Sequence, residues 1–198
     1  MGLWGASDAD ENKPKNLTDA EKKEVFANTK GWVREAGSTA SGNDNTSADE
    51  EVLVAIGGLS AAIGAADITE IEFITTAFDK SDGGNIDVRV RFNEPVVVNT
   101  SGGTPRVSIT NGNQGSGSGR GPHLANYLSG TGTNELVFRC TIAAANAATN
   151  ADDVLVIGAN ALALNSGTIK DVATSTTNAT ITNSASIGTA AGSITVTA

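Results

Sequence analysis

Residues 85–98 restrict the fold of this chain more than any other stretch. Apolar and charged side chains alternate along it, with Ile86, Val88, Val90 and Phe92 on one face and Asp87, Arg89 and Arg91 on the other. A period of two is that of a β-strand with one face in a core and one face in water. The sequence therefore predicts a half-buried antiparallel strand. We expect Pro95 to break or bend it, because proline cannot donate a hydrogen bond to a neighbouring strand.

Shorter runs of the same kind continue from residue 68 to the C-terminus. We expect strands at 68–78, 106–110, 124–128, 135–141, 154–157, 168–170, 179–182 and 193–197. The side chains predicted to point inward from two of them are Val107, Ile109, Leu136, Phe138 and Cys140. Only 4% of the residues are aromatic and 23 are glycine, a composition typical of short strands joined by many turns. With a strand about every ten residues, the fold class we predict is all-β, with a β-sandwich as its main part.

The chain is acidic, with 22 Asp and Glu against 13 Lys and Arg and a net charge of −9. Nucleic acids and anionic membranes attract basic surfaces, so we expect neither as a partner. The first residues are acidic where a signal peptide is basic, and no apolar run reaches the length of a membrane-spanning helix. We therefore expect a chain that starts near Met1 and is not exported by the usual signal route.

Residues 1–66 differ in composition from residues 67–198, and we divide the chain there. Thr18 and Glu21 have the spacing of a capping box, which predicts a short helix from about Asp19 to Asn28. Two short strands are expected after it, at 31–34 and 51–56. Two polar stretches, 6–16 and 37–49, look unfit to fold alone. We therefore expect an extended N-terminal docking arm, with a short helix and one or two strands, that lies on its own domain or on a neighbouring subunit.

Nothing in the sequence supports catalysis. His123 is the only histidine, and without a companion it cannot form a Ser-His-Asp or Cys-His arrangement. It follows a glycine-rich stretch, so we expect it to be exposed. Cys140 is the only cysteine, which excludes a disulfide within the chain, and its inward position is that of a small core residue. We expect no enzyme activity and no cofactor.

Four oxygen-bearing side chains surround the Gly83–Gly84 turn: Asp79, Asp82, Asn85 and Asp87. Oxygen ligands at such spacing could hold Ca²⁺. Asp, Asn and Gly are also the residues that tight turns prefer for backbone reasons, and this is the alternative we favour.

The outward face of the neighbouring strands carries charges of both signs. We expect Arg89, Arg91 and Arg139 to form ion pairs in water with Asp87 and Glu135. Each such exposed pair is worth less than ~1 kcal/mol.

Four blocks of the second part occur in an order that resembles a known family. They are VRVRFNEPVVV, GGTPRVSI, NYLSGTGTNELVFRCTI and DDVLVIGANALALNSGTIKD. This order is similar to the bacterial Ig-like repeats of cyanobacterial cell-surface and other large adhesive proteins, over roughly residues 68–183. The resemblance implies an Ig-like β-sandwich for residues 67–198. The family often continues from Asp with Ala-Ala-Gly-Asn, whereas this chain has Asp171-Val172-Ala173-Thr174, so the resemblance does not define the register of the last strand.

The first part carries a second resemblance. MGLWG, the linker Asn12-Lys13-Pro14-Lys15, GWV at 31–33 and EVLVAIGGL at 51–59 are similar to small virion structural proteins of marine tailed phages, especially cyanophages. Together the two resemblances imply a phage particle protein, made in the host cytoplasm and located on the capsid exterior. Its N-terminal arm would dock on the major capsid protein or other virion subunits of a symmetric assembly.

Two alternatives stay open. One is a neck, tail or fibre component, and the other, from a different class, is a carbohydrate-binding adhesion module that would recognise host-surface glycans. Specific sugar binding needs exposed aromatic side chains, and the second part offers mainly Tyr127, whose strand position suggests the core.

Trp4 and Trp32 are the only tryptophans, and both precede residue 67. Large aromatic side chains often anchor interfaces, which favours this region as the docking surface. The interface residues predicted on this basis are Leu3, Trp4, Phe26, Trp32 and Val33. The two tryptophans could also close a small core of the arm with Phe26 and Val52, and the two interpretations are compatible.

Overall fold

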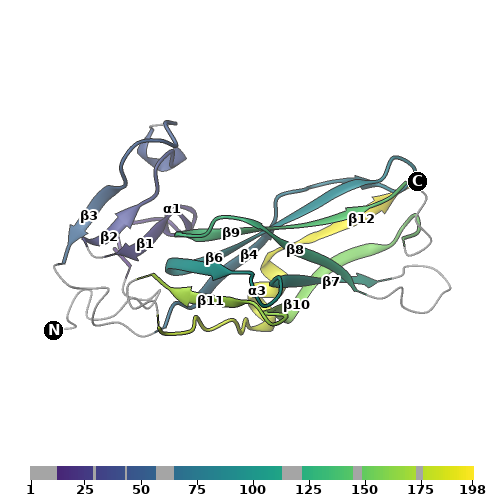
Figure 1. The fold of residues 1–198 in the computed structure, drawn as a ribbon. Helices are drawn as coiled ribbons and strands as arrows, with labels where there is room; N and C mark the ends of the chain where they lie inside the picture. Colours follow the sequence, from purple (N-terminus) through teal and green to yellow (C-terminus); the bar gives the residue numbers. More distant parts are fainter. Residues whose placement is uncertain are drawn as a thin grey trace.

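The computed structural model describes residues 13–28, 30–42, 44–56, 65–112, 122–144, 149–172 and 176–198 of the chain. This part is mostly β, which confirms the predicted all-β class. No helix within it is long and apolar enough to span a membrane. The strands belong to two sheets: a small one at one end of the molecule and a larger one that extends to the C-terminus at the other end (Figure 1).

The small sheet is antiparallel and has the strand order β1-β2-β3. Its strands are β1 (Val25–Asn28), β2 (Gly31–Arg34) and β3 (Glu51–Ala55). Helix α1 (Asp19–Lys23) precedes β1, and a 3-10 turn (Thr39–Ser41) lies between β2 and β3. We call the described residues between 13 and 56 the N-terminal unit. It holds three strands where the sequence predicted one or two, because β1 forms in the region expected to be helical.

The helix predicted from Asp19 to Asn28 is right at its start and wrong in its length. The Thr18 hydroxyl accepts a hydrogen bond from the Glu21 amide at 3.3 Å, and the Glu21 carboxylate accepts one from the Thr18 amide at 2.8 Å, so the capping box is present. The helix buries none of its side chains and ends at Lys23. A helix this short is marginal in water without a packed face. The next residues instead join β1, where β-branched and aromatic side chains are favoured.

Among the described residues, the larger sheet has nine strands, and it curls around the main hydrophobic core. Eight strands follow the order β11-β6-β9-β8-β7-β10-β12-β5, and β4 pairs with β6 beside this path. Their bounds are β4 (Ile68–Phe73), β5 (Phe78–Asp79), β6 (Gly84–Asn99), β7 (Arg106–Gly112), β8 (His123–Ser129), β9 (Thr133–Ile142), β10 (Val154–Ala163), β11 (Thr168–Asp171) and β12 (Ser193–Thr197). Neighbouring strands are antiparallel except β12 and β5, which run parallel.

Strand β6 is the one predicted from residues 85–98, and the larger sheet is arranged around it. One of its edges pairs with β9, and the other pairs first with β4 and then with β11. Pro95 does not break the strand, which continues to Asn99, but pairing with β9 is interrupted between Arg91 and Val96. On the other edge of β6, the partner strand changes from β4 to β11 at the same place. Pro95 therefore lies where β6 changes its partner.

The side chains predicted to point inward are buried. On β6 they are Ile86, Val88, Val90 and Phe92, and on the neighbouring strands they are Val107, Ile109, Leu136, Phe138 and Cys140. At the edge of this core, the ring of Tyr127 packs edge-to-face on Phe138, with centroids 5.9 Å apart. Its hydroxyl accepts a hydrogen bond from the Thr131 amide at 2.9 Å, which holds the turn between β8 and β9.

Residues 179–182 were predicted as a strand and form only a single bridge, between Asp67 and Thr180. A short helix, α3 (Ala185–Ala190), follows and packs against β10 and β4. The Ser184 hydroxyl accepts a hydrogen bond from the Ile187 amide at 3.3 Å and caps the helix. The helix is made of small residues with little apolar periodicity, so no sequence pattern indicated it.

The buried face of β9 provides a test of the core. Replacing Phe138 by Ala should lower the free energy of unfolding by about 3–5 kcal/mol, because it removes buried apolar surface and leaves a cavity. Urea denaturation measures the loss. Leu128 is 49% exposed, and Leu128→Ala should change stability by at most about 0.5 kcal/mol. Equal losses for the two variants would contradict the assigned faces of the sheet.

Candidate functional site

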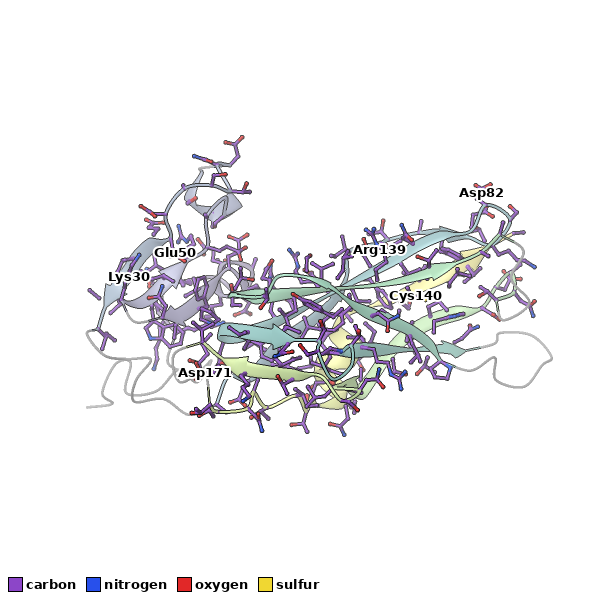
Figure 2. The ribbon with its side chains drawn as sticks, in the orientation of Figure 1. Lys30, Glu50, Asp82, Arg139, Cys140 and Asp171 are labelled. Carbon is purple, nitrogen blue, oxygen red and sulfur yellow. The ribbon has the colours of Figure 1, made fainter. Side chains whose placement is uncertain are left out.

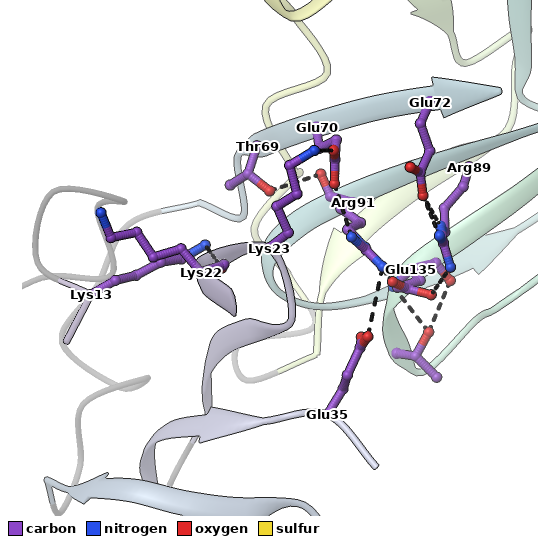
Figure 3. A network of polar contacts seen from close by, with 11 residues as sticks. Lys13, Lys22, Lys23, Glu35, Thr69, Glu70, Glu72, Arg89, Arg91 and Glu135 are labelled. Atoms are coloured by element: carbon purple, nitrogen blue, oxygen red, sulfur yellow. Dashed lines mark hydrogen bonds and ion pairs between the residues drawn. The ribbon is translucent and has the colours of Figure 1, made fainter. Parts of the chain in front are cut away.

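The N-terminal unit lies against β4 and β6, and a row of charged side chains joins it to the larger sheet (Figure 3). At the centre is Arg91 of β6, whose side chain is only 8% exposed. Three carboxylates surround its guanidinium: Glu70 of β4 at 2.9 Å, Glu135 of β9, and Glu35 of the N-terminal unit at 3.6 Å. We call these four side chains the junction cluster.

Strand register brings most of the cluster together. Arg91 lies opposite Glu70 of β4 and opposite Glu135 of β9, so three outward side chains form one row across the sheet. Directly opposite side chains on neighbouring strands are ~5 Å apart, which is within reach of an ion pair. Two residues earlier on β6, Arg89 donates a hydrogen bond from Nε to Glu72 at 2.5 Å and pairs with Glu135 at 3.3 Å.

The N-terminal unit supplies two further charges. Lys23, the last residue of α1, pairs with Glu70 at 2.5 Å. Glu35 directly follows β2, and its amide donates a hydrogen bond to the Glu24 carbonyl at 2.9 Å, which holds it beside the start of β1. The sequence pattern indicated Arg91 and Glu135 but neither Lys23 nor Glu35, because no local pattern places side chains of the first part over the second.

The expectation of ion pairs on a solvated face is wrong for Arg91. Its guanidinium is covered, and a buried cation is stable only with close counter-charges and hydrogen bonds. Arg139 on β9 does fit the expectation, since its side chain is 40% exposed and pairs with Asp87 at 2.6 Å.

The environment of the cluster changes two pKa values. Burial and the negative charge of Glu135 raise the pKa of Glu35 to about 7, although the positive charge of Arg91 opposes the change. Burial disfavours the charged form of Arg91, but Glu135, Glu35 and Glu70 outweigh it and raise the pKa of the guanidinium. Arg91 therefore stays charged, whereas Glu35 takes up a proton near neutral pH.

Apolar contacts accompany the charged ones. Phe26 and Val33 are opposite each other in β1 and β2, so their side chains share one face of the small sheet, and both are buried. Phe26 also lines a cleft of about 570 Å³ together with Glu35, Arg89 and Pro95. This face of the small sheet is therefore turned toward the larger one.

Trp32 lies on the opposite face of the small sheet and is 0% exposed. Its neighbours form a small core made of Val25, Ala27, Leu17, Leu53, Val54 and Ile56. The expected core partners differ from these, because Phe26 belongs to the other face and Val52 is 43% exposed. Leu3 and Trp4 lie outside the described residues. As docking residues for a partner, Leu3, Trp4, Phe26, Trp32 and Val33 stay a prediction.

The four residues considered for Ca²⁺ have other contacts. Asp87 accepts two hydrogen bonds from Arg139, at 2.7 and 2.6 Å, which lower its pKa. Asp79 accepts from the hydroxyl and amide of Ser81, at 2.6 and 2.8 Å, and these bonds lower its pKa. Asn85 accepts from the Thr141 hydroxyl at 2.7 Å. Asp82 is at the end of the molecule far from the N-terminal unit (Figure 2). Within the ranges that the structure describes, no three His, Cys, Asp or Glu side chains are grouped to hold a metal.

The burial of Cys140 agrees with the prediction from the sequence, and that of His123 does not. Cys140 is buried as predicted, and burial raises the pKa of its thiol. His123 was expected to be exposed but is half-buried, with Nε2 3.2 Å from the Thr149 hydroxyl. Burial lowers its pKa, while the negative charge of Asp153 acts in the opposite direction.

A comparison of the chain with known protein families, curated proteins and solved structures finds no match. What the site can do is therefore inferred from its geometry alone. The junction cluster neutralises a buried guanidinium and joins the N-terminal unit to the larger sheet.

Removing the central cation should show how strongly the cluster holds the fold. Arg91→Met keeps the length of the side chain but leaves three carboxylates close together, so we expect a loss of about 3–5 kcal/mol in the free energy of unfolding. Urea denaturation at pH 7 measures it. Arg139→Met removes an exposed pair on the same face and should cost far less. If the two variants lost the same stability, Arg91 would not be the centre of a buried ion-pair cluster.

The raised pKa of Glu35 can be measured directly. Carboxyl ¹³C NMR should show Glu35 titrating near pH 7, well above the ordinary 4.5 of a glutamate. Glu135→Gln removes the neighbouring negative charge and should lower the pKa of Glu35. A wild-type titration near 4.5 would contradict the buried, like-charged environment.

Proposed function

We propose that this chain is a non-enzymatic virion structural protein of a tailed phage, most simply a capsid decoration protein. Its N-terminal residues attach to the major capsid protein or another virion subunit, and its C-terminal part is an Ig-like domain presented outward. The observation that carries the proposal is the match between the Ig-like sequence blocks and the strands of the larger sheet.

Each block of the resemblance corresponds to one structural piece. VRVRFNEPVVV lies in β6, and GGTPRVSI covers the turn before β7 and the first part of that strand. NYLSGTGTNELVFRCTI is the hairpin of β8 and β9, and DDVLVIGANALALNSGTIKD spans β10 and β11. All these strands belong to one curled sheet whose inward side chains share the main hydrophobic core. This supports an Ig-like arrangement of the curl.

The elongated shape of the molecule is compatible with attachment to the capsid at one end and display of the other end. The N-terminal unit occupies one end, and the C-terminus lies at the opposite end, beyond β12 (Figure 1). Phe26, Trp32 and Val33 are already buried within the chain, so the residues we favour as the first contacts with a capsid are Leu3 and Trp4.

Intact phage particles that carry the protein provide the test. Electron cryo-microscopy should find the chain on the capsid lattice, in a copy number that follows the capsid symmetry. Density at the neck, tail or fibre would replace the decoration role by one of those, and absence from purified particles would end the virion proposal.

The docking role is tested separately. A variant in which both Leu3 and Trp4 are replaced by Ala should no longer co-sediment with capsids stripped of the native protein, whereas Leu128→Ala should still do so. Circular dichroism checks that both variants fold. Undiminished attachment of the double variant would exclude these residues as anchors.

A further inference from the structure

The charges at the junction do not balance. Among the residues that the structure describes, four carboxylates share three cations in the connected network: Glu35, Glu70, Glu72 and Glu135 with Lys23, Arg89 and Arg91. One negative charge is therefore left over in a partly buried region, where charges are screened less than in water.

The distances show that Glu35 is the carboxylate of the junction cluster with the weakest contact to a cation. Glu70 has two close cations, Lys23 at 2.5 Å and Arg91 at 2.9 Å, and Glu135 pairs with both arginines. Glu35 has one, Arg91, at 3.6 Å, which is longer than a good hydrogen bond. Glu35 is also the only carboxylate of the junction cluster that comes from the N-terminal unit.

Most groups that face Glu35 carry negative charge. The charges that act on Glu35 are those of Glu135 of β9 and Glu24 next to α1, both negative, and of Arg91 of β6. Two clefts that Glu35 lines are also lined by Asp49, Glu50, Glu51 and Arg89. Burial and the charge of Glu135 raise the pKa of Glu35 to about 7. Neutralising this side chain removes the excess charge and allows its carboxyl group to donate a hydrogen bond to Glu135.

We propose that the contact between the N-terminal unit and the larger sheet, which we call the seat, depends on one proton. The contact is closed when Glu35 is neutral and loosened when Glu35 is ionised. The other junction ion pairs do not involve Glu35, since Glu70 and Glu135 each contact two cations. A single proton therefore controls how firmly two parts of the chain are held together.

The direction follows from linkage. The pKa of Glu35 is about 7 in the seated unit and returns toward 4.5 when the side chain reaches water. The seated state binds the proton more tightly, so protonation favours it. Its contribution is fully present below pH 4.5 and is lost as the pH rises through 7. The N-terminal unit is thus seated more firmly in mildly acidic solution than in mildly alkaline solution.

Loosening of the seat has a measurable consequence. The small sheet has three strands and a small core around Trp32, and a unit of so few residues buries too little surface to be more than marginally stable alone. Release from the larger sheet therefore exposes the amides of β1 and β2 to exchange with solvent.

Hydrogen–deuterium exchange of the full-length protein at pH 6 and pH 8 is the test, with rates divided by the intrinsic rate at each pH. Protection of β1 and β2 should fall about tenfold from pH 6 to pH 8, as expected for a pKa near 7, while β9 serves as an internal reference. Glu35→Gln is neutral at both values and should show no fall. Its protection should exceed that of the wild type already at pH 6, because the contribution of the neutral side chain is fully present in the wild type only below pH 4.5.

Asp87→Asn is the matched control, because Asp87 pairs with Arg139 outside the junction network, and it should keep the wild-type response. A wild-type change below about threefold, or an undiminished fall in Glu35→Gln, would overturn the proposal. If Glu35→Gln did not fold, ¹³C titration of Glu35 in the wild type would decide, since a pKa near 4.5 leaves nothing to drive the change.

Discussion

The arrangement of the two parts of this chain depends on one buried guanidinium, that of Arg91, which lies between them. Taking Arg91 out of water costs several kcal/mol, and only close carboxylates with good hydrogen-bond geometry offset that cost. Two of them stand on the flanking strands and one comes from the N-terminal unit. The packing of that unit therefore contributes to the balance of charge around Arg91, and the junction is the place where we propose that the molecule responds to pH.

One strand serves both of these needs. The inward face of β6 carries the centre of the hydrophobic core, and its outward face carries Arg89 and Arg91. The pairing irregularity near Pro95 lets the same strand pass from β4 to β11 along one edge while β9 stays on the other. In the role proposed above, the larger sheet is the displayed part and the N-terminal unit is the attached part.

Much of the fold could be predicted, because strand faces follow from a local period of two. The alternation in residues 85–92 and 135–141 is strong enough that each inward side chain is buried where expected. The errors come from competition between local and distant interactions. Residues 25–28 follow a valid capping box, yet they form a strand. Pairing with β2 is more favourable than extending a helix that has no buried face. The helix α3 has small residues and no apolar stripe, so packing against β10 and β4, and not pattern, supports it.

By itself, the sequence determined the all-β class, the inward faces of the main strands and the start of α1, since each depends on neighbours a few positions apart. Only the tertiary structure decided that Arg91 is covered, that Trp32 closes a small core without Phe26, and that Glu35 meets Glu135. The physical reason is distance along the chain. Lys23 and Glu70 are 47 positions apart and Arg91 and Glu135 are 44, and no period or motif encodes which of many outward charges will meet once the N-terminal unit packs on the sheet.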